Sequence, residues 1–222
     1  MRRNLTGYSQ HHCQQATAQG EQGEAHESTR KPLRAWGALA ALGQLGAGGL
    51  LLQAPDAWAY VESDEARLLR AGACVVMLRH AQTDPSVGDP PEFDLAQCRT
   101  QRKLSGPGRA QARRIGEWFN ARQLKPRAVQ SSAWCRCKET ADLAFRQHTV
   151  LPALSSTFAS SNAQPGQTQL LRALLGAVPK GQFDVWVTHQ VNITALTGET
   201  VSMGEAIFVG SSGGAMFSTR FG

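Results

Sequence analysis

The sequence predicts an α/β fold, a three-layer sandwich in which helices cover both faces of a mostly parallel central sheet. One observation behind this is the alternation of short apolar runs with stretches of helical period between residues 60 and 222. A second is that these apolar runs end in polar residues, as buried parallel strands do where their carboxyl ends deliver side chains to a site. Right-handed crossovers would then place helices on both faces.

The predicted elements begin with an apolar strand over 74–79. A long loop without clear periodicity follows over 84–103, and loops of this length in a compact domain are usually functional. A helix then begins after Ser105, which is a suitable N-cap with Pro107 in the first turn. The remaining elements, in order, are a strand over 128–132, a helix over 134–146, a strand over 149–154, a helix over 165–178, a strand over 183–188, a helix over 190–196 and closing strands near 206–210 and 215–220.

The first 59 residues differ in composition from the rest. Residues 1–29 contain few large apolar side chains and predict a disordered N-terminal extension. Residues 30–59 combine a basic start, an apolar run and the triplet Ala57-Trp58-Ala59, which together predict a signal peptide. A transmembrane anchor is the alternative, since the apolar run approaches the length of a membrane span. Cleavage after Ala59 would leave a periplasmic or secreted domain over 60–222, without stable membrane insertion.

The net charge and the cysteines indicate which classes of ligand, and which covalent links, can be expected. The formal net charge of +6 suits anionic ligands, but no basic cluster is interleaved with aromatic residues, so no nucleic-acid binding is expected. Zinc is not expected either, because the histidines lack suitably spaced cysteine partners. Four of the five cysteines lie within residues 60–222: Cys74, Cys98, Cys135 and Cys137. An oxidising compartment would permit disulfides among them, and four cysteines allow three pairings.

Three segments with potential chemistry lie at the ends of predicted strands. Each brings basic, hydroxyl or imidazole side chains to the same edge of the sheet, where ligands of such folds bind. In chain order they are Leu78-Arg79-His80-Ala81-Gln82-Thr83, Ser131-Ser132-Ala133-Trp134-Cys135-Arg136-Cys137-Lys138-Glu139-Thr140-Ala141 and Val187-Thr188-His189-Gln190.

The order and content of these segments resemble the motifs of the histidine phosphatase superfamily, which includes the phosphoglycerate mutase-like enzymes. The resemblance implies that His80 attacks phosphorus and forms a phosphohistidine, while His189 hydrogen-bonds a phosphate oxygen. It also implies that Arg79 and Arg136 hold the phosphoryl oxygens with their guanidinium forks. Thr83 is expected to contact either the phosphate or its own loop. The function implied is a phosphatase for a phosphomonoester or phosphoanhydride, with a small phosphorylated substrate and neither cofactor nor metal.

Several points stay open at this level. A phosphate-binding module of the same fold that has lost catalysis is the alternative function, and a mutase is a less favoured third. His148 is expected to be solvated, and Gln190 is a weak site candidate. A bridge from Cys98 to Cys135 or Cys137 would brace the long loop. The oligomeric state is not predicted. The general acid is unassigned: no acid at all is one possibility, and the candidates are Asp84, Asp89, Glu92, Asp94, Glu199 and Glu205.

Overall fold

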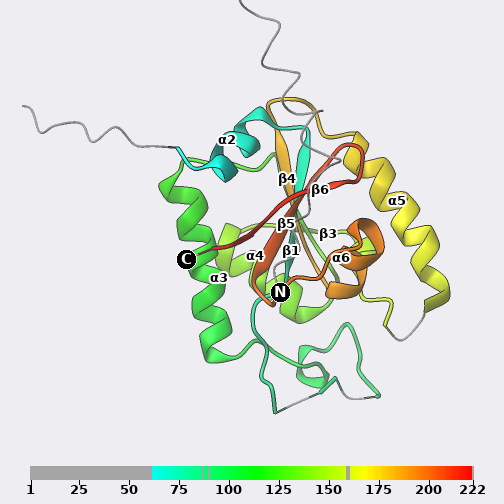
Figure 1. Ribbon diagram of the computed structural model, residues 1–222. Helices are drawn as coiled ribbons and strands as arrows, with labels where there is room; N and C mark the ends of the chain where they lie inside the picture. The colour runs from blue at the N-terminus through cyan, green and yellow to red at the C-terminus, as the bar shows by residue number, and fades with distance from the viewer. Residues whose placement is uncertain (1–61, 87, 90, 159–160, 222) are drawn as a thin grey trace, which may run out of the picture. The chain divides into compact units, whose positions relative to one another are not determined.

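The computed structural model describes residues 62–221 except 87, 90, 159 and 160 (Figure 1). The predicted extension over 1–29 and the predicted signal peptide over 30–59 lie outside the described residues. Among the helices that are described, none is long and apolar enough to cross a membrane.

A six-stranded sheet forms the middle layer, with β1 (Cys74–Arg79) beside β4 (Phe183–Thr188) at its centre. The strand order is β3-β2-β4-β1-β5-β6. The first four strands in this order are parallel, whereas β5 runs antiparallel to β1 and pairs with β6 as a hairpin at the edge. The predicted mostly parallel sheet is therefore confirmed. The other strands are β2 (Ala128–Ser131), β3 (Thr149–Val150), β5 (Glu205–Gly210) and β6 (Ala215–Arg220).

Helices cover both faces of this sheet, as predicted (Figure 1). One face packs against α2 (Asp64–Ala71), α3 (Gly106–Ala121) and α4 (Cys135–Phe145), and the other against α5 (Gln164–Gly176) and α6 (Gln190–Thr197). The sequence analysis did not anticipate α2. Its start is nevertheless marked by Ser63, whose side chain accepts a hydrogen bond from the backbone of Ala66.

The apolar run of β1 is continuous because the strand is buried on both faces. Cys74, Val76 and Leu78 point into one core, while Val75 and Met77 point into the other. Successive strand residues face opposite sides of a sheet, so a strand covered on both sides has no position for a polar residue until it ends. This leaves the polar side chains of the three motifs at the carboxyl edge.

The strand predicted over 149–154 is only partly right. Thr149 and Val150 pair with β2, but Pro152–Leu154 form a short 3₁₀ helix, η2. Pro152 has no N–H to give to a ladder, so the chain leaves the sheet there. Two other short 3₁₀ helices are η1 (Cys98–Thr100) in the long loop and η3 (Ser161–Ala163) before α5.

The N-terminus of α3 holds the segment that follows β1. The Ser105 side chain caps the helix by accepting from Gly108 N, 3.0 Å away, and its backbone N–H donates to the Gln82 carbonyl. Gly108 packs so closely on that carbonyl that a Cβ at this position would overlap it. The helix start therefore fixes the backbone immediately after His80.

Candidate active site

The ends of β1, β2 and β4 bring the three motifs together. Parallel pairing sets Arg79 opposite Thr188 and Ser131 opposite Val187, so His80, Ser132 and His189 follow at the same level. The backbone N–H of His80 continues the ladder by donating to the Thr188 carbonyl, 3.0 Å away. As a result, the rings of His80 and His189 lie with centroids 5.5 Å apart, and both side chains are buried.

The two ring nitrogens of His80 differ, because only Nδ1 makes a hydrogen bond among the described residues. Its Nδ1 lies 2.9 Å from the Ala81 carbonyl oxygen, which can only accept, so Nδ1 carries the hydrogen. Nε2 then bears a lone pair. Burial, followed by the nearby positive charge of Arg136, lowers the pKa of His80 to about 3. The imidazole is therefore neutral and available as a nucleophile at neutral pH.

His189 occupies the N-cap position of α6. Its Nε2 lies 2.8 Å from Ser132 Oγ and 3.4 Å from Cys137 Sγ. Burial, followed by the neighbouring His80 and the arginines, lowers the pKa of His189 well below its usual range. A positively charged His189 imidazolium is thus disfavoured in this environment. A dianionic ligand would favour it again by bringing opposite charge.

Arg136 lies buried in the first turn of α4. Its Nη1 donates to Asp89 Oδ1 at 2.9 Å, and its guanidinium carbon lies 4.3 Å from the centroid of the Trp134 ring. Burial lowers the pKa of Arg136, although an arginine remains charged at any physiological pH. Its buried Nε has no hydrogen-bond partner among the described residues, so this donor is unpaired there.

Arg79 is held by the segment after α6. Its Nη1 donates to the Val201 carbonyl at 2.8 Å and to Gln190 Oε1 at 3.4 Å. Gln190 Oε1 also accepts from the backbone of Val201. Gln190 thus supports Arg79, which gives this weak sequence candidate a structural role. The buried Nε of Arg79 again has no partner.

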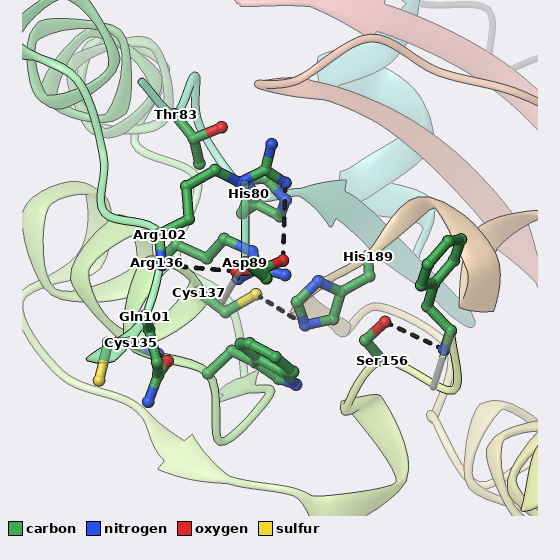
Figure 2. A network of polar contacts seen from close by, with 12 residues as sticks. His80, Thr83, Asp89, Gln101, Arg102, Cys135, Arg136, Cys137, Ser156 and His189 are labelled. Carbon is green, nitrogen blue, oxygen red and sulfur yellow. Dashed lines mark hydrogen bonds and ion pairs between the residues drawn. The ribbon is translucent and has the colours of Figure 1, made fainter. Parts of the chain in front are cut away.

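Arg102 is a third guanidinium at the site that the sequence analysis missed. It comes from the end of the long loop, and its Nη2 lies 3.9 Å from Asp89 Oδ2. Its Nε is buried without a partner, like those of Arg79 and Arg136. Figure 2 marks the contact of Asp89 with Arg136 by a dashed line, close to the two histidines. Three guanidinium groups are therefore available to one anion.

A cavity of about 520 Å³ opens between these groups. It contains four of the five predicted site residues. Thr83 is the exception: its backbone bridges to Leu104, and its Oγ1 lies 3.6 Å from Met203 Sδ. Of the two roles considered for Thr83, the contacts match the one within the loop. The lining residues are Arg79, His80, Asp89, Pro91, Phe93, Arg102, Trp134, Arg136, Ser156, Phe158, His189, Gln190 and Val191.

Asp89 is the one candidate acid that lines this cavity. Asp84 accepts hydrogen bonds from Ser86, and Asp94 accepts them from Ala96 and Gln97, which lowers the pKa of each carboxyl. Both serve turns of the loop instead. Glu92, Glu199 and Glu205 are not among the lining residues.

A disulfide joins Cys98 to Cys135, with Cα atoms 5.6 Å apart. The side chain of Gln101 adds to this link by accepting from the backbone N–H of Cys135. The long loop is thereby tied to the residue next to Arg136, as the proposed bracing bridge required. Cys137 is not in the bridge, because it points into the core, where burial raises the pKa of its thiol to about 12.

The hydroxyl of Thr140 joins the first motif to the second. It accepts from Ala81 N at 3.1 Å and donates to the Arg136 carbonyl at 2.7 Å. His148, in contrast, lies away from the cavity. It was expected to be solvated, but its side chain is largely covered and Nδ1 lies 2.9 Å from Asp142 Oδ1. In the part of the chain that is described, no group of three potential metal ligands is found.

Stability should fall as the pH drops below about 6.5, the ordinary histidine pKa, because His80 and His189 remain neutral in the fold while both protonate in the unfolded chain. The loss continues toward pH 3 for His80 and amounts to about 1.4 kcal/mol per pH unit for each such histidine. Urea unfolding between pH 6 and 5 measures the slope. The variant His80→Gln should lose about half of the histidine contribution, and an unchanged slope would contradict this account.

The fold and site together define a protein that can hold a phosphoryl-type anion against two imidazoles. The family profile described as the histidine phosphatase superfamily (branch 1) matches residues 75–159. This match confirms the resemblance to that superfamily. The matched segment includes His80, Arg102 and Arg136, and His189 lies beyond it.

The solved structures that this chain matches include phosphatases. The protein histidine phosphatase SixA complexed with tungstate has 18% identity and a TM-score of 0.46, over 66% of this chain and 96% of its own. A putative phosphohistidine phosphatase SixA from Agrobacterium tumefaciens has 22% identity and a TM-score of 0.45, over 62% and 91%. A mycobacterial glucosyl-3-phosphoglycerate phosphatase complexed with VO3 has 21% identity and a TM-score of 0.45, over 61% and 92%. No curated protein matches the chain.

Proposed function

We propose that this protein is a phosphatase that hydrolyses a phosphomonoester or phosphoanhydride through a phosphohistidine on His80. The observation that carries the proposal is the neutral His80 imidazole, with Nε2 unprotonated, in a cavity that three guanidinium groups also line. A nucleophile facing a concentration of positive charge suits attack on an electron-rich phosphoryl group.

The reaction has two displacements. In the first, the lone pair of His80 Nε2 forms a bond to phosphorus while the bond from phosphorus to the leaving oxygen breaks, and that oxygen takes up a proton. In the second, water attacks the phosphohistidine and gives a proton back to the group that protonated the leaving oxygen. The P–N bond breaks, and inorganic phosphate leaves as His80 returns to its neutral state. The negative charge on the phosphoryl oxygens is held throughout by Arg79, Arg102 and Arg136.

Asp89 is our candidate for the group that protonates the leaving oxygen. In the ligand-free site its carboxylate lies against Arg136, where a phosphoryl oxygen of the substrate would bind. A substrate dianion would take over the arginine donors and displace the Asp89 carboxyl from Arg136. The carboxylic acid would then stand beside the ester oxygen.

Asp89→Asn should lower kcat for alkyl phosphates by about 10²- to 10⁴-fold, because an amide cannot protonate a poor leaving group. The fall for nitrophenyl phosphate should be less than about tenfold, since that leaving group departs without a proton. The measurement is kcat across a series of leaving groups. Glu92→Gln, which changes a carboxylate of the same loop outside the cavity, is the matched control. An equal fall across the whole series would refute the acid role.

Trapping the intermediate tests the proposed function directly. After brief incubation with a radiolabelled phosphate ester and quenching in alkali, the protein should carry label that acid removes. His80→Asn should carry none, whereas His148→Asn, which changes a histidine outside the cavity, should label normally. Binding of phosphate without any labelled protein or turnover would identify the non-catalytic phosphate-binding module instead.

We also propose that the protein is exported and acts in the periplasm or outside the cell. The support is the signal-peptide pattern over 30–59 together with the Cys98–Cys135 bridge, since stable disulfides are typical of oxidising compartments. Cell fractionation with mass analysis of the purified N-terminus is the test. We expect extracytoplasmic protein that begins at Tyr60, and cytosolic, uncleaved protein in which Cys98 and Cys135 are free thiols would refute export.

A further inference from the structure

The entrance of the cavity is apolar. Pro91 and Phe158 are exposed, and Phe93 and Val191 are half-buried, whereas His80, Arg136 and His189 are buried. We call the first four residues the apolar rim. Phe158 stands out because 89% of its surface is exposed. An exposed phenyl ring at the mouth of an anion site leaves apolar surface that a ligand can cover.

A row of planar groups in contact connects this rim to the phosphoryl site. The Phe93 and Trp134 rings lie with centroids 4.3 Å apart, tilted by 37°, and Arg136 lies over the Trp134 ring at 4.3 Å. These contacts fix Phe93 relative to the guanidinium that would hold the phosphoryl group. An organic group attached to that phosphoryl would therefore contact aromatic rings that are already held in place.

The polar side chains near the rim are already engaged. Gln190 Oε1 accepts from Arg79 and from the Val201 backbone, and Gln190 Nε2 donates to Thr194 and to the Glu199 carbonyl. Ser156 Oγ accepts from the backbone of Phe158, so only its own hydroxyl hydrogen is left to donate. A sugar entering here would give up several hydrogen bonds to water and regain only a few from these side chains, which is costly.

The charge of the described lining points to a single phosphate. Three arginines against the one carboxylate of Asp89 give an excess of two positive charges. A phosphomonoester carries about two negative charges at neutral pH. No further Lys or Arg of the described lining is left for a second phosphate.

From this we infer that the substrate is a phosphomonoester of an apolar alcohol, aromatic or aliphatic, whose organic part lies against Phe93 and Phe158. This inference rests on the proposed function only in placing the phosphoryl group between the arginines and His80. It excludes sugar phosphates and compounds with two phosphates as preferred substrates.

Phosphonates test the inference without turnover, because their P–C bond resists hydrolysis. We expect calorimetry on the purified protein to show benzylphosphonate binding about tenfold or more tighter than methylphosphonate, from the additional apolar area covered. A polyhydroxylated phosphonate of similar size should bind no tighter than methylphosphonate. Equal affinities for benzyl- and methylphosphonate, or tightest binding of the hydroxylated compound, would overturn the inference.

Variants locate the effect and separate the two proposals. Phe158→Ala should weaken the binding of benzylphosphonate by about fivefold relative to that of methylphosphonate, because an apolar contact is lost. Leu170→Ala removes another exposed apolar side chain, on α5 outside the cavity, and should change neither affinity. An equal loss of benzylphosphonate affinity in both variants would contradict a contact between the ligand and the apolar rim. Label trapped on His80 without any benzyl preference would overturn the substrate class alone, whereas a benzyl preference without label would overturn the proposed catalysis alone.

Discussion

Arg136→Ala is expected to lower kcat/KM for an aryl phosphate by about 10²- to 10³-fold, the usual cost of removing one preorganised donor from a transition state. Arg136 is buried beside His80 and has an unpartnered Nε, so its loss removes both charge and a directed hydrogen bond. Arg136→Lys should recover only part of the activity, since an ammonium keeps the charge but cannot form the planar fork.

The matched control for this prediction is Arg114→Ala, which removes an exposed arginine of α3. It should leave kcat/KM unchanged. Thermal unfolding of each variant separates a catalytic effect from loss of the fold. Full activity of a folded Arg136→Ala protein would contradict the assignment, as would an equal fall in both variants.

Removing the Cys98–Cys135 bridge should both destabilise the protein and reduce its activity. The bridge spans 37 residues, and closing a loop of that length contributes about 4 kcal/mol in the chain-entropy model. The same bond holds the loop that supplies Asp89 and Arg102, so a double Cys98→Ser, Cys135→Ser variant should lose much of its kcat/KM even where it remains folded.

Urea unfolding and steady-state kinetics on the double variant measure the two effects separately. Mild reduction of the unaltered protein should reproduce the kinetic loss, and reoxidation should restore activity. Unchanged activity in the reduced, folded protein would show that the loop keeps its position without the covalent link.

The sequence predicted the strand-end part of the site because periodicity and order suffice for it. Apolar runs ending at His80 and His189 identify buried parallel strands, and such strands meet at one edge. Arg136 was predicted from its motif and from its position after the strand that is now β2. None of these required knowledge of how a loop folds.

Arg102 was missed, and Asp89 could not be singled out from the six candidate acids, because both belong to a long loop without a repeating pattern. A signal was nevertheless present. Had Cys98 been paired with Cys135, the residues near Cys98 would have been placed beside Arg136. Helical geometry decides between the two cysteines, since neighbours two apart point to opposite sides of a helix. Cys137 faces the core, so Cys135 faces the loop.

The limits of the fold prediction have local causes. The strand expected at 149–154 stops early at Pro152, whose missing donor outweighs the apolar content of the segment. Helix α2 is short and was overlooked, although the Ser63 cap and the acidic residues Asp64 and Glu65 mark its start. His148 was judged by its polar neighbours in sequence, whereas its partner Asp142 lies six residues earlier in α4.

The contact between Asp89 and Arg136 means that the resting protein carries its own internal counter-ion. An anion that enters must exchange with this carboxylate and cannot simply fill empty space. Chloride and other singly charged ions gain too little from one guanidinium to do so, whereas a doubly charged tetrahedral ion that engages several arginines at once can. We therefore expect the site to bind a dianion selectively over the ions of background salt.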